Sequence, residues 1–209
     1  MNQKSGADRH PVSWPEALRR LREGNRRFAA DLRSVEAMSG RERREALVAG
    51  QKPFAIVLSC SDSRAPSEMI FDCGLGDLFV VRVAGNVVAP SIVGSVEFAA
   101  ATFGTELVVV MGHSRCGAVV ATVDALATGK EAPSPNVGDI VARISPGITE
   151  LVRDARRTGD VVEACIRANV RASANHLRHG SRILEQRIAE GRLQVVGAEY
   201  ALESGEVDF

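Results

Sequence analysis

A chain of 209 residues fits one domain with a substantial hydrophobic core. Its 26 basic and 26 acidic residues balance, which removes the electrostatic case for a nucleic acid or a membrane as partner. No apolar run approaches the length of a membrane span, and the polar start, Met1 to His10, lacks the apolar stretch of a secretory signal. We therefore expect a cytoplasmic location, in which Cys73 and Cys165 stay free thiols.

The first predicted element is an amphipathic helix from Trp14 to Ala30. Ser13 is a suitable cap before Pro15, and the apolar positions recur at helical spacing: Trp14, Ala17, Leu18, Leu21 and Phe28. Acidic residues are interleaved with its arginines, which is typical of a solvated face. We expect one domain over 1–209, with a helical arm over 1–50 and an α/β core over 51–209.

Strand and helix patterns alternate through the core. Phe54–Leu58 and Leu107–Met111 are short apolar runs rich in β-branched residues, as in buried parallel strands. Ser91–Phe103 and Cys116–Ala127 have the pattern of crossover helices, so the fold class is α/β with a central, mostly parallel sheet flanked by helices. Two further helices are predicted over 137–156 and 161–179, with Pro146 expected to interrupt the first.

A polar cluster directly follows each of the two apolar runs. The first is Cys60-Ser61-Asp62-Ser63-Arg64, and the second is His113-Ser114-Arg115-Cys116. Parallel strands that are neighbours in one sheet end at the same edge, where open α/β sheets place their ligands. Two thiolates, an imidazole and a carboxylate suit tetrahedral zinc. The clusters predict one zinc per chain, held by Cys60, Asp62, His113 and Cys116, because Cys73 and Cys165 lack His partners at ligand spacing.

Other interpretations of these clusters remain. The cysteines are ordinary buried thiols in one alternative, and the zinc site is purely structural in another. A carboxylate ligand exchanges more readily than a thiolate, which favours a catalytic site. Arg64 projects on the same side as Asp62 in an extended chain and can hold its carboxylate bidentately, although a surface Arg that stabilises a turn has the same spacing. Asp62 would then either bind zinc or pair with Arg64, and only the pairing leaves room for water on the metal.

With these motifs the chain resembles the β-class carbonic anhydrases. Gly112 and Gly117 flank the second cluster, Phe79–Asn86 looks like the family's second strand and following loop, and residues 195–207 look like its closing strands. The resemblance covers roughly Trp14 to Phe209. It implies a zinc-dependent lyase, a carbonic anhydrase, that hydrates carbon dioxide reversibly to bicarbonate and a proton.

The resemblance also implies roles and partners. Asp62 and Arg64 would be catalytic, and Gln51 would reach across a dimer interface toward the substrate. The N-terminal helix would pack on a partner subunit of a homodimer or a homotetramer, an assembly of dimers. Val57 stands where the branch with an allosteric bicarbonate pocket carries Trp, so that regulation is not expected.

Two rival functions are compatible with the same residues. One is hydrolysis of carbon disulfide or carbonyl sulfide, which would depend on the access channel and not on the metal ligands. The other is a zinc-stabilised binding module without turnover, in which Asp62 and Arg64 are merely structural.

Overall fold

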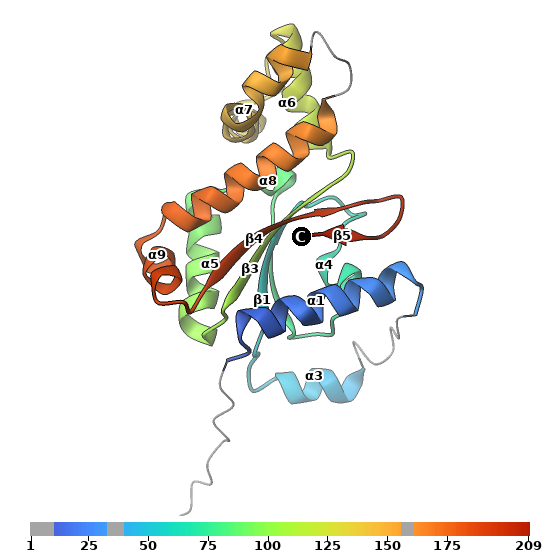
Figure 1. Ribbon diagram of the computed structural model, residues 1–209, viewed down its shortest axis with the longest axis vertical. Coiled ribbons are helices and arrows are strands. Elements are labelled where there is room, and N and C mark those ends of the chain that lie inside the picture. The colour runs from blue at the N-terminus through green and yellow to red at the C-terminus, as the bar shows by residue number, and fades with distance from the viewer. Residues whose placement is uncertain (1–10, 33–39, 156–160) are drawn as a thin grey trace, which may run out of the picture.

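The computed structural model describes residues 11–32, 40–155 and 161–209, so the polar stretch Met1 to His10 lies outside the described residues. A five-stranded sheet of order β2-β1-β3-β4-β5 forms the centre (Figure 1). The first four strands are parallel, and β5 is antiparallel to β4. Their bounds are β1 Ala55–Ser59, β2 Leu78–Arg82, β3 Leu107–His113, β4 Gln194–Tyr200 and β5 Val207–Asp208. The predicted mostly parallel sheet is confirmed.

The two predicted strands β1 and β3 lie side by side in the middle of the sheet. Every residue of both is buried, as expected for β-branched runs covered on both faces. They pair in parallel with Ser59 opposite Met111. The residues that follow β1 and the last residues of β3 therefore meet at one edge.

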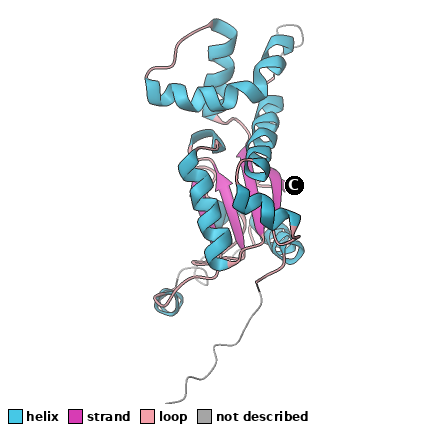
Figure 2. Ribbon diagram, turned by 90° about the vertical axis from the view of Figure 1, so that its left-hand side faces the viewer, coloured by secondary structure: helices cyan, strands magenta, loops and turns pink. Residues whose placement is uncertain are grey.

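Helices cover both faces of this sheet (Figures 1 and 2). One face packs against α1 (Trp14–Ala29) and α4 (Ser67–Ile70), and the other against α5 (Pro90–Phe103), α8 (Val162–His179) and α9 (Arg182–Ala189). Helices α6 (Gly117–Thr128) and α7 (Pro135–Ala155) pack together beyond the carboxyl ends of the strands. The short α3 (Arg41–Leu47) has no buried residues. A 3₁₀ turn, η1 (Ala84–Asn86), connects β2 toward α5.

The N-terminal helix packs on this chain's own core. Ala17 and Leu21 are fully buried in the cluster that covers the sheet. Gly24 lies so close to the backbone of Phe71 that an added Cβ would stand 1.9 Å from its carbonyl oxygen. Asn25 donates to the carbonyl oxygens of Ile70 and Gly205. The helix begins at Trp14 as predicted and ends at Ala29, one residue before the predicted end. Its buried face packs on this chain, and contact of the rest of the arm with a partner subunit stays a prediction.

Helix α7 runs through Pro146, contrary to the predicted interruption. Ile144 and Ile148 on either side are fully buried against α6 and α8. Packing of this apolar face keeps the helix continuous where a proline costs one backbone hydrogen bond. In the described part of the chain, no helix is both long enough and apolar enough to cross a membrane.

Candidate metal centre

The loop after β1 carries the first predicted ligand. Cys60 is only 5% exposed. Its Sγ accepts two backbone N–H groups, from Asp62 and from Gly85, each at 3.4 Å. Since N–H donors stabilise a thiolate, the loop presents this sulfur in the form that binds metal.

His113 ends β3, and Cys116 stands at the N-cap of α6. Both are 1% exposed. The two sulfurs and an imidazole nitrogen lie within 4.8 Å of one another. His113 Nδ1 is 2.9 Å from the Ser114 carbonyl oxygen, which makes Nδ1 the protonated nitrogen and leaves a lone pair on Nε2. Nε2 is buried without a hydrogen-bond partner among the described residues, as a metal-binding nitrogen would be.

These donors fit zinc. Two sulfurs and one imidazole nitrogen are its preferred ligand types, and three protein ligands are the number found in catalytic sites that keep a fourth position open. In the described ranges, the grouped ligand atoms include no carboxylate. The structure thus brings together three of the four predicted ligands, Cys60, His113 and Cys116.

The proximity of the two thiols shifts their pKa values in opposite directions. The Cys116 thiol stabilises the Cys60 thiolate and lowers the pKa of Cys60 to about 4, although burial acts against this. The pKa of Cys116 is raised, because the thiolate of Cys60 and burial both disfavour a second negative charge. Burial opposes protonation of His113, but the neighbouring Cys60 raises its pKa. A cation placed between these groups would relieve that repulsion.

Asp62, the fourth predicted ligand, is paired with Arg64. Arg64 Nε and Nη2 donate to the two carboxylate oxygens at 3.0 and 2.8 Å, and the Arg64 amide donates to Oδ1 at 2.9 Å. Arg64 holds the pKa of Asp62 well below its usual range. Asp62 Oδ2 is nevertheless only 3.9 Å from His113 Nε2. Of the two predicted arrangements, the structure shows the carboxylate beside the cluster and bound to Arg64.

Arg82 is a residue that the sequence prediction missed. It ends β2 directly opposite Ser59 of β1. Its Nε donates to the Cys60 carbonyl at 2.9 Å and its Nη2 to the Asp62 carbonyl at 2.6 Å. The guanidinium therefore fixes the backbone of the loop that carries both side chains. The alignment of β2 with β1 would have indicated it, since both strands end in polar residues.

Gln51 lies at the other end of β1. It is exposed and precedes the strand, whereas Cys60 follows it. Four residue steps along β1 separate these ends by about 13 Å. The structure does not bring Gln51 into its own chain's cluster.

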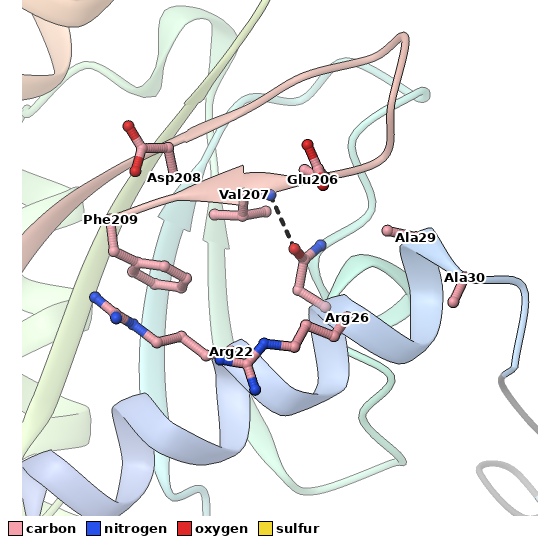
Figure 3. Close-up of a pocket in the computed structure, with 9 residues that line it drawn as sticks. Arg22, Arg26, Ala29, Ala30, Glu206, Val207, Asp208 and Phe209 are labelled. Carbon is pink, nitrogen blue, oxygen red and sulfur yellow. Dashed lines mark hydrogen bonds between the residues drawn. The ribbon is translucent and has the colours of Figure 1, made fainter.

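Two surface hollows differ in their relation to the cluster. A hollow of about 390 Å³ is lined by Arg64 together with Arg115, Tyr200, Leu202 and Glu203. A larger one, of about 730 Å³, lies between α1 and β5 and includes Arg22, Arg26 and Phe209 (Figure 3). None of the three cluster residues lines either hollow, but Arg64, which holds Asp62 beside the cluster, lines the smaller one. We therefore assign the chemistry to the edge beside Arg64.

Cys73 is expected to be inert in the folded protein. It is 9% exposed, its Sγ donates to the Phe71 carbonyl, and burial raises its pKa to about 12. At about pH 8, roughly one such thiol in ten thousand is ionised. Iodoacetamide followed by mass spectrometry should label Cys73 only after denaturation. Labelling of the native protein at the rate of the unfolded chain would contradict this.

Comparison with known proteins agrees with this geometry. The family model described as carbonic anhydrase matches residues 55–207. A carbonic anhydrase of Mycolicibacterium smegmatis is 40% identical over 200 residues, covering 95% of each chain. Carbonic anhydrase 2 of Mycobacterium tuberculosis is 40% identical over 189 residues, covering 90% of this chain and 89% of that one.

Solved structures show the same fold. The β-carbonic anhydrase CcaA superposes with a TM-score of 0.71 at 26% identity, covering 91% of this chain and 86% of that chain. The β-carbonic anhydrase CafA of Aspergillus fumigatus superposes with a TM-score of 0.73 at 26% identity, covering 88% and 86%.

Proposed function

The chain belongs to the β-class carbonic anhydrases, zinc lyases that hydrate carbon dioxide reversibly to bicarbonate and a proton, and we propose how its residues divide this work. Cys60, His113 and Cys116 hold one zinc per chain, and Asp62 and Arg64 are the catalytic pair. The observation that carries this assignment is the buried sulfur–imidazole cluster with the Asp62–Arg64 pair 3.9 Å away from its imidazole.

Zinc bound by these three ligands would act as a Lewis acid and make hydroxide available from water. Arg64 holds both carboxylate oxygens of Asp62, which keeps Asp62 ionised and away from the metal position. The remaining lone pairs of Asp62 accept a hydrogen bond from the nucleophile and orient it toward the substrate carbon. Arg82 fixes the carbonyls of Cys60 and Asp62, so that the ligand and the orienting carboxylate keep their relative positions.

A stopped-flow carbon dioxide hydration assay with a pH indicator tests this function. The zinc-loaded protein should accelerate hydration, and it should be assayed in parallel for hydrolysis of carbon disulfide and carbonyl sulfide. Zinc-loaded protein without hydration activity would identify a non-catalytic binding module. Turnover of the sulfur substrates alone would identify the rival hydrolase.

Hydration activity should rise from about pH 6.5 to about pH 9. Two thiolates give zinc more negative charge than neutral imidazoles do, so hydroxide becomes available above about pH 7. Asp62 does not contribute to this rise, because its pKa is lowered and it is ionised throughout the range. Initial rates with the zinc content checked at each pH measure the profile. A flat profile over this range would refute hydroxide as the nucleophile.

We further propose that the active form is a homodimer or an assembly of dimers. Gln51 is exposed and precedes the amino end of β1, whereas Cys60 follows its carboxyl end, and the strand between them is about 13 Å long. A contribution of Gln51 to substrate binding therefore requires a second subunit. In that arrangement its side-chain amide donates to a substrate oxygen in the partner's site.

Subunit mixing is expected to show a shared site. Gln51→Ala and Arg64→Ala variants should each be poorly active alone, because each lacks one half of every site. Dissociated and reassembled together, they form mixed dimers in which one of the two sites is intact, so about half of the wild-type activity per mixed dimer should return. A fully active monomer in light scattering, or mixtures no more active than their parents, would refute the shared site.

A cytoplasmic location is part of the same proposal. Cys60 and Cys116 serve as ligands only while they are reduced, and all four cysteines are free in the structure. A reducing compartment maintains that state.

A further inference from the structure

The Cys60 thiolate receives an N–H group from outside its own loop. The Asp62 amide is local, but Gly85 belongs to η1, on the far side of β2 in the chain. Both amides stand 3.4 Å from Sγ. The position of the Gly85 N–H donor therefore depends on the contacts that η1 makes with the rest of the fold.

The backbone conformation of η1 is strained and needs contacts from neighbouring elements to stabilise it. Gly85 has φ 69° and the next residue, Asn86, has φ 44°, so two successive residues are left-handed. A Cβ on Gly85 would meet Ile144 Cδ1 at 2.9 Å and Ala118 Cβ at 3.0 Å. Glycine is required there by conformation and by space, and the turn depends on its neighbours.

Asn169 of α8 supplies the anchor. Its side chain is buried, with 2% exposure, and Nδ2 donates to the Gly85 carbonyl oxygen at 2.7 Å. The carbonyl of Gly85 is thus held by Asn169 while its amide faces Cys60 Sγ. Rotation about Gly85, which would turn the amide away from the sulfur, would break the bond to Asn169 or strain it.

We propose that Asn169 is a positioning residue for the zinc ligand Cys60, acting through Gly85. It lies 84 residues from Gly85 in the sequence and acts on the ligand through the backbone of η1. The N–H···S bond that it secures orients the thiolate and withdraws charge from it. Hydrogen bonds of this kind to ligating sulfurs tune both metal affinity and the electronic properties of the site. The proposal rests on Cys60 being a zinc ligand.

The test compares Asn169→Ala and Asn169→Asp with a matched control, Ser173→Ala. Asp keeps the volume of Asn and removes the N–H donor, and Ser173 is a buried polar residue one turn later on α8. Zinc release to a chelator should be about 10- to 100-fold faster in both Asn169 variants and unchanged in the control. In cobalt-substituted protein, the sulfur-to-cobalt charge-transfer bands of the Asn169 variants should move to longer wavelength, because a thiolate without its hydrogen bond is the better donor.

Folded Asn169 variants with wild-type zinc release and unshifted cobalt bands would overturn the proposal. If neither variant folds, NMR of wild-type protein loaded with ¹¹³Cd tests the hydrogen bond from Gly85 to the Cys60 sulfur. A scalar coupling between the metal and the Gly85 amide proton supports the bond through sulfur, and its absence overturns the proposal. A Cys60→Ala variant distinguishes failure of the ligand assignment from failure of the Asn169 proposal. Zinc bound as tightly as in the wild type would show that Cys60 is not a ligand. Loss of zinc from Cys60→Ala, together with wild-type zinc release from Asn169→Ala, would refute only the role of Asn169.

Discussion

Replacing Arg64 with alanine is expected to lower carbon dioxide hydration by about 10²- to 10³-fold while one zinc per chain is retained. The reason is the pairing seen in the structure, in which both guanidinium donors bind the two oxygens of Asp62. Without Arg64 the carboxylate, already 3.9 Å from His113 Nε2, is free to turn onto the metal position and exclude water. Stopped-flow rates together with metal analysis measure both parts of the prediction.

Arg143→Ala is the matched control for Arg64→Ala. Arg143 holds Asp139 in the same two-pronged way, at 2.7 and 3.0 Å, on α7 and outside the ligand set. Its loss should leave turnover close to wild type. Arg64→Lys should recover only part of the activity, because an ammonium group cannot hold both oxygens in the plane of the carboxylate. Wild-type turnover in Arg64→Ala would show that the Asp62–Arg64 pair is not needed for catalysis.

The double variant Cys60→Ala, Cys116→Ala is expected to contain almost no zinc and to show no hydration activity above background. One imidazole remains from the three ligands, and a single nitrogen does not hold zinc against buffer and water. Inductively coupled plasma mass spectrometry on gel-filtered protein gives the stoichiometry. The wild type should carry one zinc per chain.

Cys165→Ala separates loss of ligands from loss of packing. Cys165 is fully buried and lies in the same apolar cluster as Cys60 and Cys116, but it is not among the grouped ligand atoms. That variant should keep its zinc. Full zinc retention in the double variant would mean that the metal is bound elsewhere.

Much of the framework could be predicted from local sequence. The runs that became β1 and β3 are almost entirely apolar, and only strands covered on both faces tolerate that composition. Cys60 and His113 could be placed together because each stands at the carboxyl end of such a run. The prediction needed no knowledge of how the helices pack.

The remaining features depend on contacts between distant segments. Nothing near Asn169 in the sequence indicates that its amide meets Gly85, and nothing near Gly24 indicates that it fits against Phe71. The latter contact holds α1 against its own core. Pro146 shows the same limit, since a local rule predicted a break where buried Ile144 and Ile148 keep the helix whole.

The pairing of β1 with β3 also links zinc binding to folding. The two strands are neighbours in space, but β2 and α5 lie between them in the chain, so a long loop has to close before Cys60 meets His113 and Cys116. Such non-local pairing is slow compared with helix formation. The complete ligand set exists only when β1 and β3 are paired, so zinc binding stabilises the folded chain by mass action.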